Sequence, residues 1–132
     1  MSKLFSEADY QALRQYVAQA VALLPDQIQA ILLFGSKARG DSTSDSDMDL
    51  MIVLQEDTLT RREQLRSFVF DILLETSIYL STQILSDDLF RQLPVRRPLF
   101  YANLIRDGIL LYARPDANMP EFPKRLDLIA AV

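Results

Sequence analysis

Apolar residues in the first quarter of the chain recur with the spacing of a helix. The segment from Ser6 to Asp9 has the form of a capping box, and Pro25 stops the pattern. The apolar face between them follows the spacing i, i+4, i+7, i+8 and i+11, at Leu13, Val17, Ala20, Val21 and Leu24. A nearly continuous apolar run, Ile28–Phe34, comes next. The pattern therefore predicts an amphipathic helix followed by a buried strand.

Segments of the same two kinds alternate up to residue 112. Further strands are predicted over Asp47–Leu54, Ile78–Leu85 and Gly108–Tyr112. Further helices are predicted from Thr58 through an apolar face that ends near residue 73, from a cap at Ser86 to a stop at Pro94, and over Leu99–Arg106. Residues 35–46 are almost without apolar side chains and are predicted as a loop or a broken helix. Strands that alternate with helices in so short a chain indicate an α/β (α+β) layer fold.

The chain length indicates one domain with a tail. A length of 132 residues fits a single domain. We assign residues 1–113 to that domain and residues 114–132 to the tail, which contains three prolines and then a short amphipathic piece around Leu126–Ile129. The tail is either a strap over its own core or a docking element for a partner, and the sequence leaves both alternatives open.

The composition excludes several kinds of chemistry. The chain has no Cys and no His, so it has no disulfide, no thiol nucleophile, no Ser-His-Asp triad and no imidazole zinc site. The net charge of −4 disfavours a nucleic-acid binder, which usually shows a basic footprint. No apolar run approaches the ~20 residues of a membrane span. The first residues do not have the form of a signal peptide, and we therefore expect a cytoplasmic protein without membrane contact.

The segment after the first strand carries the candidate chemistry. Two of the three glycines, Gly35 and Gly40, lie in it. A glycine after a strand lets backbone N–H groups approach a phosphate, and Ser36 can donate its hydroxyl to the same oxygens. Lys37 and Arg39 supply positive charge, with paired donors in the case of Arg39. This composition is typical of a polyphosphate-binding loop.

Two acidic residues follow at the start of the next predicted strand. Asp47 and Asp49 are two positions apart, so their side chains point to the same face of the strand. Two neighbouring carboxylates repel each other unless a cation joins them, and Mg²⁺ is a hard divalent ion that binds both carboxylate and phosphate oxygens. Two such ions about 4 Å apart would suit phosphoryl or nucleotidyl transfer.

Together these residues resemble the signature of a known superfamily. Gly35-Ser36, ten intervening residues and then Asp47-Met48-Asp49 match the GS-x10-DxD pattern of the DNA polymerase β-like nucleotidyltransferases. The surrounding residues are more closely similar to the MNT proteins, the minimal nucleotidyltransferases, and the resemblance extends over residues 28–112. It implies a polymerase β-like nucleotidyltransferase core, which is a small mixed sheet flanked by helices.

The resemblance also implies an activity, a substrate and a partner. It implies that ATP is the substrate, that Mg²⁺ is the cofactor, and that the site consists of the phosphate-binding residues Gly35, Ser36, Lys37 and Arg39 and the catalytic, metal-binding residues Asp47 and Asp49. MNT proteins are typically encoded beside a HEPN-domain protein, with which they form a toxin–antitoxin pair. The better-understood members transfer AMP from ATP to a tyrosine of the HEPN toxin. The chain would then act as an antitoxin within a homo- or hetero-oligomer.

One feature departs from the superfamily pattern. Its members usually carry a third carboxylate on the next core strand, where it helps to deprotonate the attacking hydroxyl. The predicted strand Ile78–Leu85 contains no acid. Glu75, on the preceding helix, is the nearest substitute, and we expect that it does not take this role.

The missing acid keeps three functions open. The first is Mg²⁺-dependent transfer of AMP to a hydroxyl of a HEPN toxin. The second is an antitoxin with a weak or inactive site that neutralises its partner by binding. The third, transfer of a nucleotide to a hydroxyl of a small molecule, rests on analogy with the superfamily alone.

Overall fold

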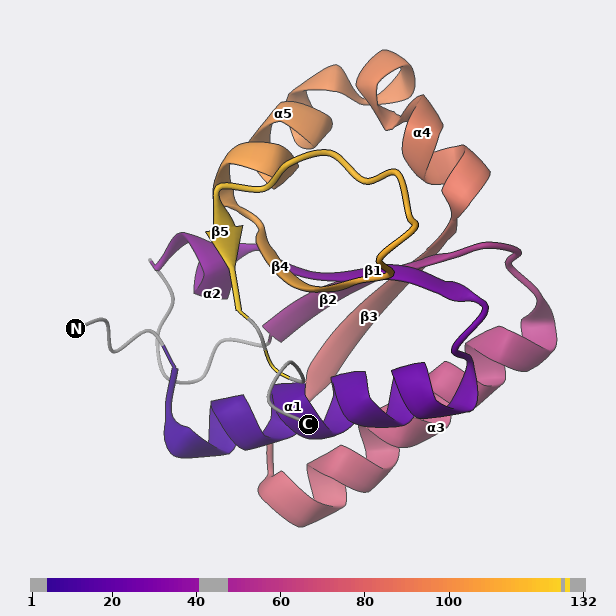
Figure 1. Cartoon of the computed structure of the whole chain (residues 1–132). Coiled ribbons are helices and arrows are strands. Elements are labelled where there is room, and N and C mark those ends of the chain that lie inside the picture. The colour runs from indigo at the N-terminus through magenta and orange to yellow at the C-terminus, as the bar shows by residue number, and fades with distance from the viewer. Residues whose placement is uncertain (1–4, 41–47, 127, 129–132) are drawn as a thin grey trace.

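The computed structural model describes residues 5–40, 48–126 and 128. These residues form a five-stranded sheet with helices against both faces (Figure 1). In chain order the elements are α1 (Glu7–Leu23), β1 (Ile28–Phe34), α2 (Ser36–Arg39), β2 (Met48–Leu54), α3 (Leu59–Thr76), β3 (Leu80–Ser86), α4 (Asp87–Arg96), α5 (Pro98–Asp107), β4 (Ile109–Ala113) and β5 (Lys124–Arg125). The first four strands agree with their predicted ranges to within two residues.

The sheet is mixed, with the order β3-β2-β1-β4-β5. The central strand β1 runs antiparallel to both β2 and β4, whereas β2 and β3 are parallel, as are β4 and β5. The helix α3 makes the crossover that the parallel pair β2 and β3 requires. This topology confirms the prediction of an α/β fold with a small mixed sheet flanked by helices.

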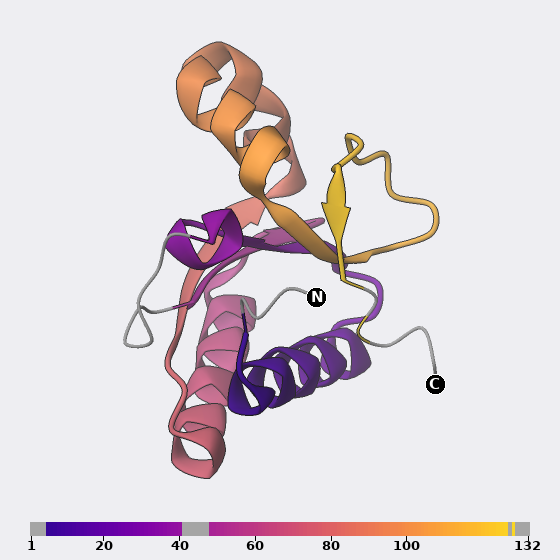
Figure 2. The same cartoon turned by 90° about the vertical axis from the view of Figure 1, so that its left-hand side faces the viewer.

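Helices cover the two faces of the sheet in pairs. In Figure 2, α1 and α3 lie on one side of the sheet and α4 and α5 on the other. Along β2, Leu50 and Ile52 belong to the core cluster under α1 and α3, while Met51 and Val53 belong to the cluster under α4 and α5. Because successive side chains of a strand point to opposite faces, Asp49 faces the α4–α5 side.

Side chains cap α1, α3 and α4, at Ser6 and Ser86 as the sequence predicts and also at Thr58. The Ser6 hydroxyl accepts a hydrogen bond from the Asp9 amide at 3.0 Å, and the Asp9 carboxylate accepts one from the Ser6 amide at 2.9 Å. This reciprocal pair is the predicted capping box. Thr58 and Ser86 cap α3 and α4 in the simpler way, through one hydroxyl each. None of the helices within the described ranges is long and apolar enough to cross a bilayer.

The prediction that Pro94 ends the fourth helix is wrong. The helix α4 continues to Arg96, and the amide of Arg97 still donates to the carbonyl of Leu93 at 2.8 Å. Proline removes one hydrogen bond to the residue four positions earlier. Since Pro94 lies in the last turn, the loss of that one bond does not interrupt the residues that follow.

The described part of the tail runs back against the sheet. It contributes β5, a two-residue strand that the sequence pattern did not predict and that pairs with β4. Phe122 is buried in the cluster under α4 and α5, and Leu126 and Leu128 pack against the cluster on the opposite face. The described part of the tail therefore contacts both core clusters, and the choice between a strap and a docking element stays a prediction. The remaining residues of the predicted amphipathic piece, including Ile129, lie outside the described residues.

Candidate active site

A tight turn joins the central strand β1 to α2. Gly35 has a φ of +82°, a left-handed conformation that residues with a Cβ rarely adopt. The chain then enters the single-turn helix α2, in which the amide of Arg39 donates to the carbonyl of Gly35 at 3.1 Å. Gly40 ends this helix with a φ of +84°. The prediction of a loop or a broken helix is therefore confirmed for residues 35–40.

Asp49 lies against this turn. In the register of β1 and β2, Asp49 pairs with Phe34, which is the residue immediately before Gly35. A Cβ added to Gly35 would come within 2.4 Å of Asp49 Oδ2. The turn thus presents bare backbone to a half-buried carboxylate from the neighbouring strand. A hard carboxylate oxygen held in this way suits Mg²⁺, so the described residues fit one ligand of the predicted metal site.

The other predicted residues around the turn are placed in part. Asp47 and the side chain of Ser36 lie outside the described residues. Arg39 is exposed at the end of α2. No group of three or more metal-ligating side chains occurs within the described ranges.

Positive charge gathers beside the end of α2. The hydrogen bond from Arg106 lowers the pKa of Asp107, and the charges of Arg106, Lys124 and Arg39 lower it further. Three cations from α2, α5 and β5 therefore act on one carboxylate. These three cations gather near Asp107 in a chain whose net charge is −4.

Lys37 does not have the environment expected of a phosphate ligand. Its ammonium group lies 3.2 Å from Asp9 Oδ2, and both side chains are only 7% exposed. The pair joins α2 to the beginning of α1. Sequence reasoning identified Asp9 only as a capping residue, and no local pattern links two residues that are 28 positions apart. The structure therefore brings Gly35, Asp49 and Arg39 to one turn and directs Lys37 into the interior.

The structure does not bring Glu75 together with Asp49. Glu75 lies on α3, where its carboxylate accepts a hydrogen bond from Gln15 of α1 at 2.9 Å. That helix layer covers the face of the sheet opposite to the one that Asp49 faces. On β3, Ser81 is the residue in register with Asp49, so the nearest side-chain position on the adjacent strand is a hydroxyl.

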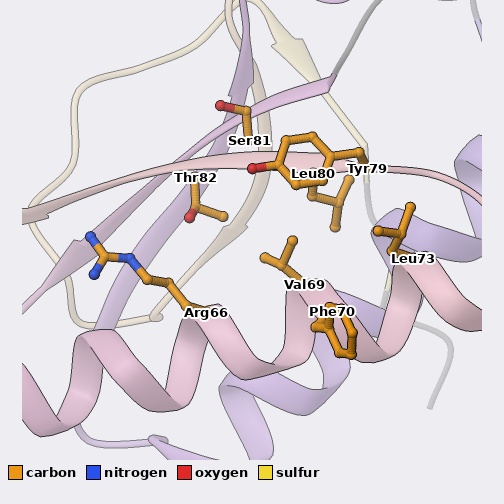
Figure 3. A pocket seen from close by; sticks show the side chains of 8 residues that line it. All are labelled: Arg66, Val69, Phe70, Leu73, Tyr79, Leu80, Ser81 and Thr82. Atoms are coloured by element: carbon orange, nitrogen blue, oxygen red, sulfur yellow. The ribbon is translucent and has the colours of Figure 1, made fainter.

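The edge of the sheet beside β3 shows the same separation of the two faces. In Figure 3, Ser81 points away from α3, whereas Thr82 and Leu80 point toward it. A pocket of about 340 Å³ lies between α3 and β3, and Val69, Leu73 and Leu80 contribute to its apolar lining. This hollow opens on the helix side of β3, so it is separate from the turn at Gly35.

The described residues thus combine a mixed sheet, a glycine turn after its central strand and a carboxylate of the neighbouring strand that lies against that turn. The family model described as "Polymerase beta, Nucleotidyltransferase" matches residues 18–117. The chain belongs to this family of nucleotidyltransferases. The prediction of a nucleotidyltransferase enzyme is thereby confirmed at the level of the family.

Individual relatives agree with this assignment. A protein of Methanocaldococcus jannaschii named "Putative protein adenylyltransferase MJ0604" is 30% identical over 105 residues, which cover 76% of this chain and 95% of the relative. A second protein of that organism, "Putative protein adenylyltransferase MJ0141", is 31% identical over 77 residues, covering 53% and 78%.

A solved structure shows the same fold. The structure of a "putative nucleotidyltransferase" from Sulfolobus solfataricus matches with a TM-score of 0.56 at 17% identity and covers 85% of this chain and 86% of that chain. A structure described as a toxin–antitoxin with AMP-PNP matches at 14% identity with a TM-score of 0.49, over 77% and 74% of the two chains. The second likeness is too low to carry an inference.

Proposed function

We propose that this chain transfers AMP from ATP, with Mg²⁺, to a tyrosine hydroxyl of a HEPN-domain toxin, and so acts as its antitoxin. The observation that carries the proposal is the close approach of Asp49 to the backbone of Gly35, in a chain of the nucleotidyltransferase family. Two relatives named as protein adenylyltransferases support the choice of AMP and of a protein acceptor.

Each residue of the turn has a separate task in this proposal. The backbone amides after Gly35, the Ser36 hydroxyl and the Arg39 guanidinium bind the phosphates of ATP. Asp47 and Asp49 hold Mg²⁺, which when bound neutralises charge on the phosphate oxygens. Lys37 was expected among the phosphate ligands, and its pairing with Asp9 instead gives it an indirect task.

The proposed transfer exchanges one phosphorus–oxygen bond for another. The acceptor oxygen bonds to the α-phosphorus of ATP as the bond from that phosphorus to the α–β bridging oxygen breaks. Pyrophosphate leaves, and the acceptor proton is released to water. Positioning and electrostatic stabilisation supply most of the rate enhancement in reactions of this kind.

One observation favours a second candidate function. The strand β3 contains no acid, and Ser81 occupies the position in register with Asp49. A general base typically contributes about 10²–10⁴-fold to a rate. The alternative is therefore an antitoxin that retains the nucleotide site with little transfer and neutralises its partner by binding.

A transfer assay separates these functions. The purified chain is incubated with MgATP labelled on the α-phosphate and with a HEPN-domain protein as the proposed acceptor, and label on that protein is measured. We expect label with the wild-type chain, and a loss of at least about 10²-fold for Asp49→Asn, since one electrostatic contact in a transfer site is worth that much.

The matched control is Glu75→Gln, which changes a carboxylate on the opposite face of the sheet. We expect its transfer rate to stay within about twofold of wild type, because Glu75 contacts Gln15 rather than the turn. Full labelling by Asp49→Asn would contradict the assignment of the site. Neutralisation of the toxin without any label would favour the binding function.

A further inference from the structure

The Gly35 turn leads into α2, a helix that is too short to be stable without contacts to the rest of the molecule. The helix α2 has only four residues, which form a single turn. Isolated helices of this length are unstable in water, because nucleation fixes several residues for one hydrogen bond. Contacts with the rest of the molecule must therefore set the direction in which α2, and the Gly35 turn that leads into it, faces.

Ala38 of α2 is completely buried in the core cluster under α1 and α3. The most deeply buried polar contact of α2 that the described residues show is the ion pair between Lys37 and Asp9. The Lys37 ammonium is 3.2 Å from Asp9 Oδ2, and both side chains are 93% buried. The same Asp9 oxygen accepts the hydrogen bond from the Ser6 amide that closes the capping box of α1. One carboxylate oxygen thus connects the beginning of α1 to the middle of α2.

A buried ion pair of this kind is weak evidence for stability. Removing two charges from water costs about as much as their attraction returns, and replacing both partners by apolar groups of similar size is often neutral or stabilising. What such a pair supplies in attested cases is a unique arrangement of the elements that it joins. Here those elements are α1 and the helix that carries the phosphate turn.

A second contact reaches α2 from the tail. The ammonium group of Lys124 on β5 donates to the carbonyl of Ala38 at 3.3 Å. Lys124 is exposed, so its bond is accessible to water and weaker than a buried one. Of these two polar contacts, the Lys37–Asp9 pair is therefore the better shielded one, and it adds a directional contact to the apolar anchor that Ala38 provides.

We propose that Lys37 and Asp9 are positioning residues, which hold α2 so that the Gly35 turn faces Asp49 and the bound phosphates. This inference rests on the proposed function of the turn as the nucleotide site. Lys37 acts through the backbone of α2 and makes no direct bond to the nucleotide. The phosphate affinity of this chain then depends on a carboxylate that lies on a different element.

The decisive experiment is a titration of MgATP into Asp9→Asn. Asparagine keeps an oxygen for the Ser6 amide, so the capping box can remain while the charge is lost. If Lys37 positions the turn, the Kd for MgATP rises about 10-fold or more, because a turn that is no longer held in place must be ordered when the nucleotide binds. If Lys37 were a direct phosphate ligand, release from Asp9 would leave the affinity equal or raise it, and that result would overturn the inference.

A double variant guards against simple unfolding. In Asp9→Asn with Lys37→Met, no charge is left buried without a partner, and we expect the melting temperature to stay within a few degrees of wild type while the Kd for MgATP remains raised. The matched control removes the pair between Arg62 and Asp57 at the start of α3, by Arg62→Met with Asp57→Asn. This control lies away from the turn and should leave the Kd unchanged.

Conservative replacement and hydrogen exchange complete the test. Lys37→Arg keeps the charge, and its Kd for MgATP should stay within about threefold of the wild-type value, because an arginine can still bind Asp9. Without nucleotide, the amides of Arg39 and Gly40 should exchange at least about tenfold faster in the double variant, since loss of the anchor frees α2 to open. Unchanged exchange would overturn the inference by itself, whereas a wild-type chain that does not bind MgATP would overturn the proposed function.

Discussion

The two faces of the sheet differ in what their side chains do. On the side of α1 and α3, the residues of β2 that point inward include Leu50 and Ile52, which are completely buried in the larger cluster. On the side of α4 and α5, the same strand begins with Asp49, half-buried against the Gly35 turn. At the beginning of β2, adjacent residues therefore serve the core on one face and the candidate active site on the other. Further along the strand, Met51 and Val53 belong to a second core cluster on the same face as Asp49.

This difference shows how a small domain separates stability from chemistry. A strand places successive side chains on opposite faces, so a polar site and a continuous core can share the same seven residues. Whether an acidic residue can belong to the site then depends on the face of the sheet that it occupies, and its distance along the chain does not decide this. Asp49 belongs to the site, whereas Glu75 lies in the opposite helix layer.

The largest expected effect comes from the core face. Leu50→Ala should lower the free energy of unfolding by about 2–5 kcal/mol, because the substitution leaves a cavity in a completely buried position. In a chain of this size that corresponds to a fall in the melting temperature of roughly 10 °C or more. The neighbouring substitution Asp49→Asn should shift the melting temperature by a few degrees at most. Equal losses in thermal melts followed by circular dichroism would contradict the separation of the two faces.

An intermediate effect is expected at the turn itself. Gly35→Ala places a Cβ at a positive φ, which costs about 1–2 kcal/mol, and directs it at Asp49. We expect a modest loss of stability together with loss of MgATP binding, measured by calorimetric titration of the folded protein. The control is Gly108→Ala, whose added Cβ would instead approach the carbonyl of Leu104. That variant should lose stability and keep its affinity for MgATP.

The smallest expected effect is on the pH dependence of stability, through a buried tyrosine on the core face. Tyr16 of α1 is buried on the core face, donates to the carbonyl of Leu65 at 3.0 Å, and has a raised pKa because burial disfavours the phenolate. The folded state then keeps its proton above about pH 10, where the unfolded chain loses it, so stability falls as pH rises through that range. The contribution of one such group is about 1.4 kcal/mol per pH unit. Thermal melts from pH 8 to 11 should therefore show a smaller decline for Tyr16→Phe than for wild type, and equal slopes would contradict this assignment.

Local patterns in the sequence were sufficient for most of the fold. The capping box at Ser6, the apolar run of β1 and the strand β2 each depend on residues within one element, and each was predicted correctly. The end of α4 was predicted wrongly, because the effect of Pro94 depends on how far from the helix terminus it lies. The strand β5 was missed because two residues are too few for any period to be visible.

By itself, the sequence determined the order of the elements, the need for glycine at position 35 and the family, since these depend on residue types at fixed spacing. Only the tertiary structure decided that Lys37 turns inward to Asp9 and that Glu75 and Asp49 occupy opposite layers. The physical reason is the same in both cases. Which side chains meet depends on the rotation of each helix about its axis and on the face of the sheet that it covers. Packing between distant segments sets both quantities, and no spacing along the chain encodes either one.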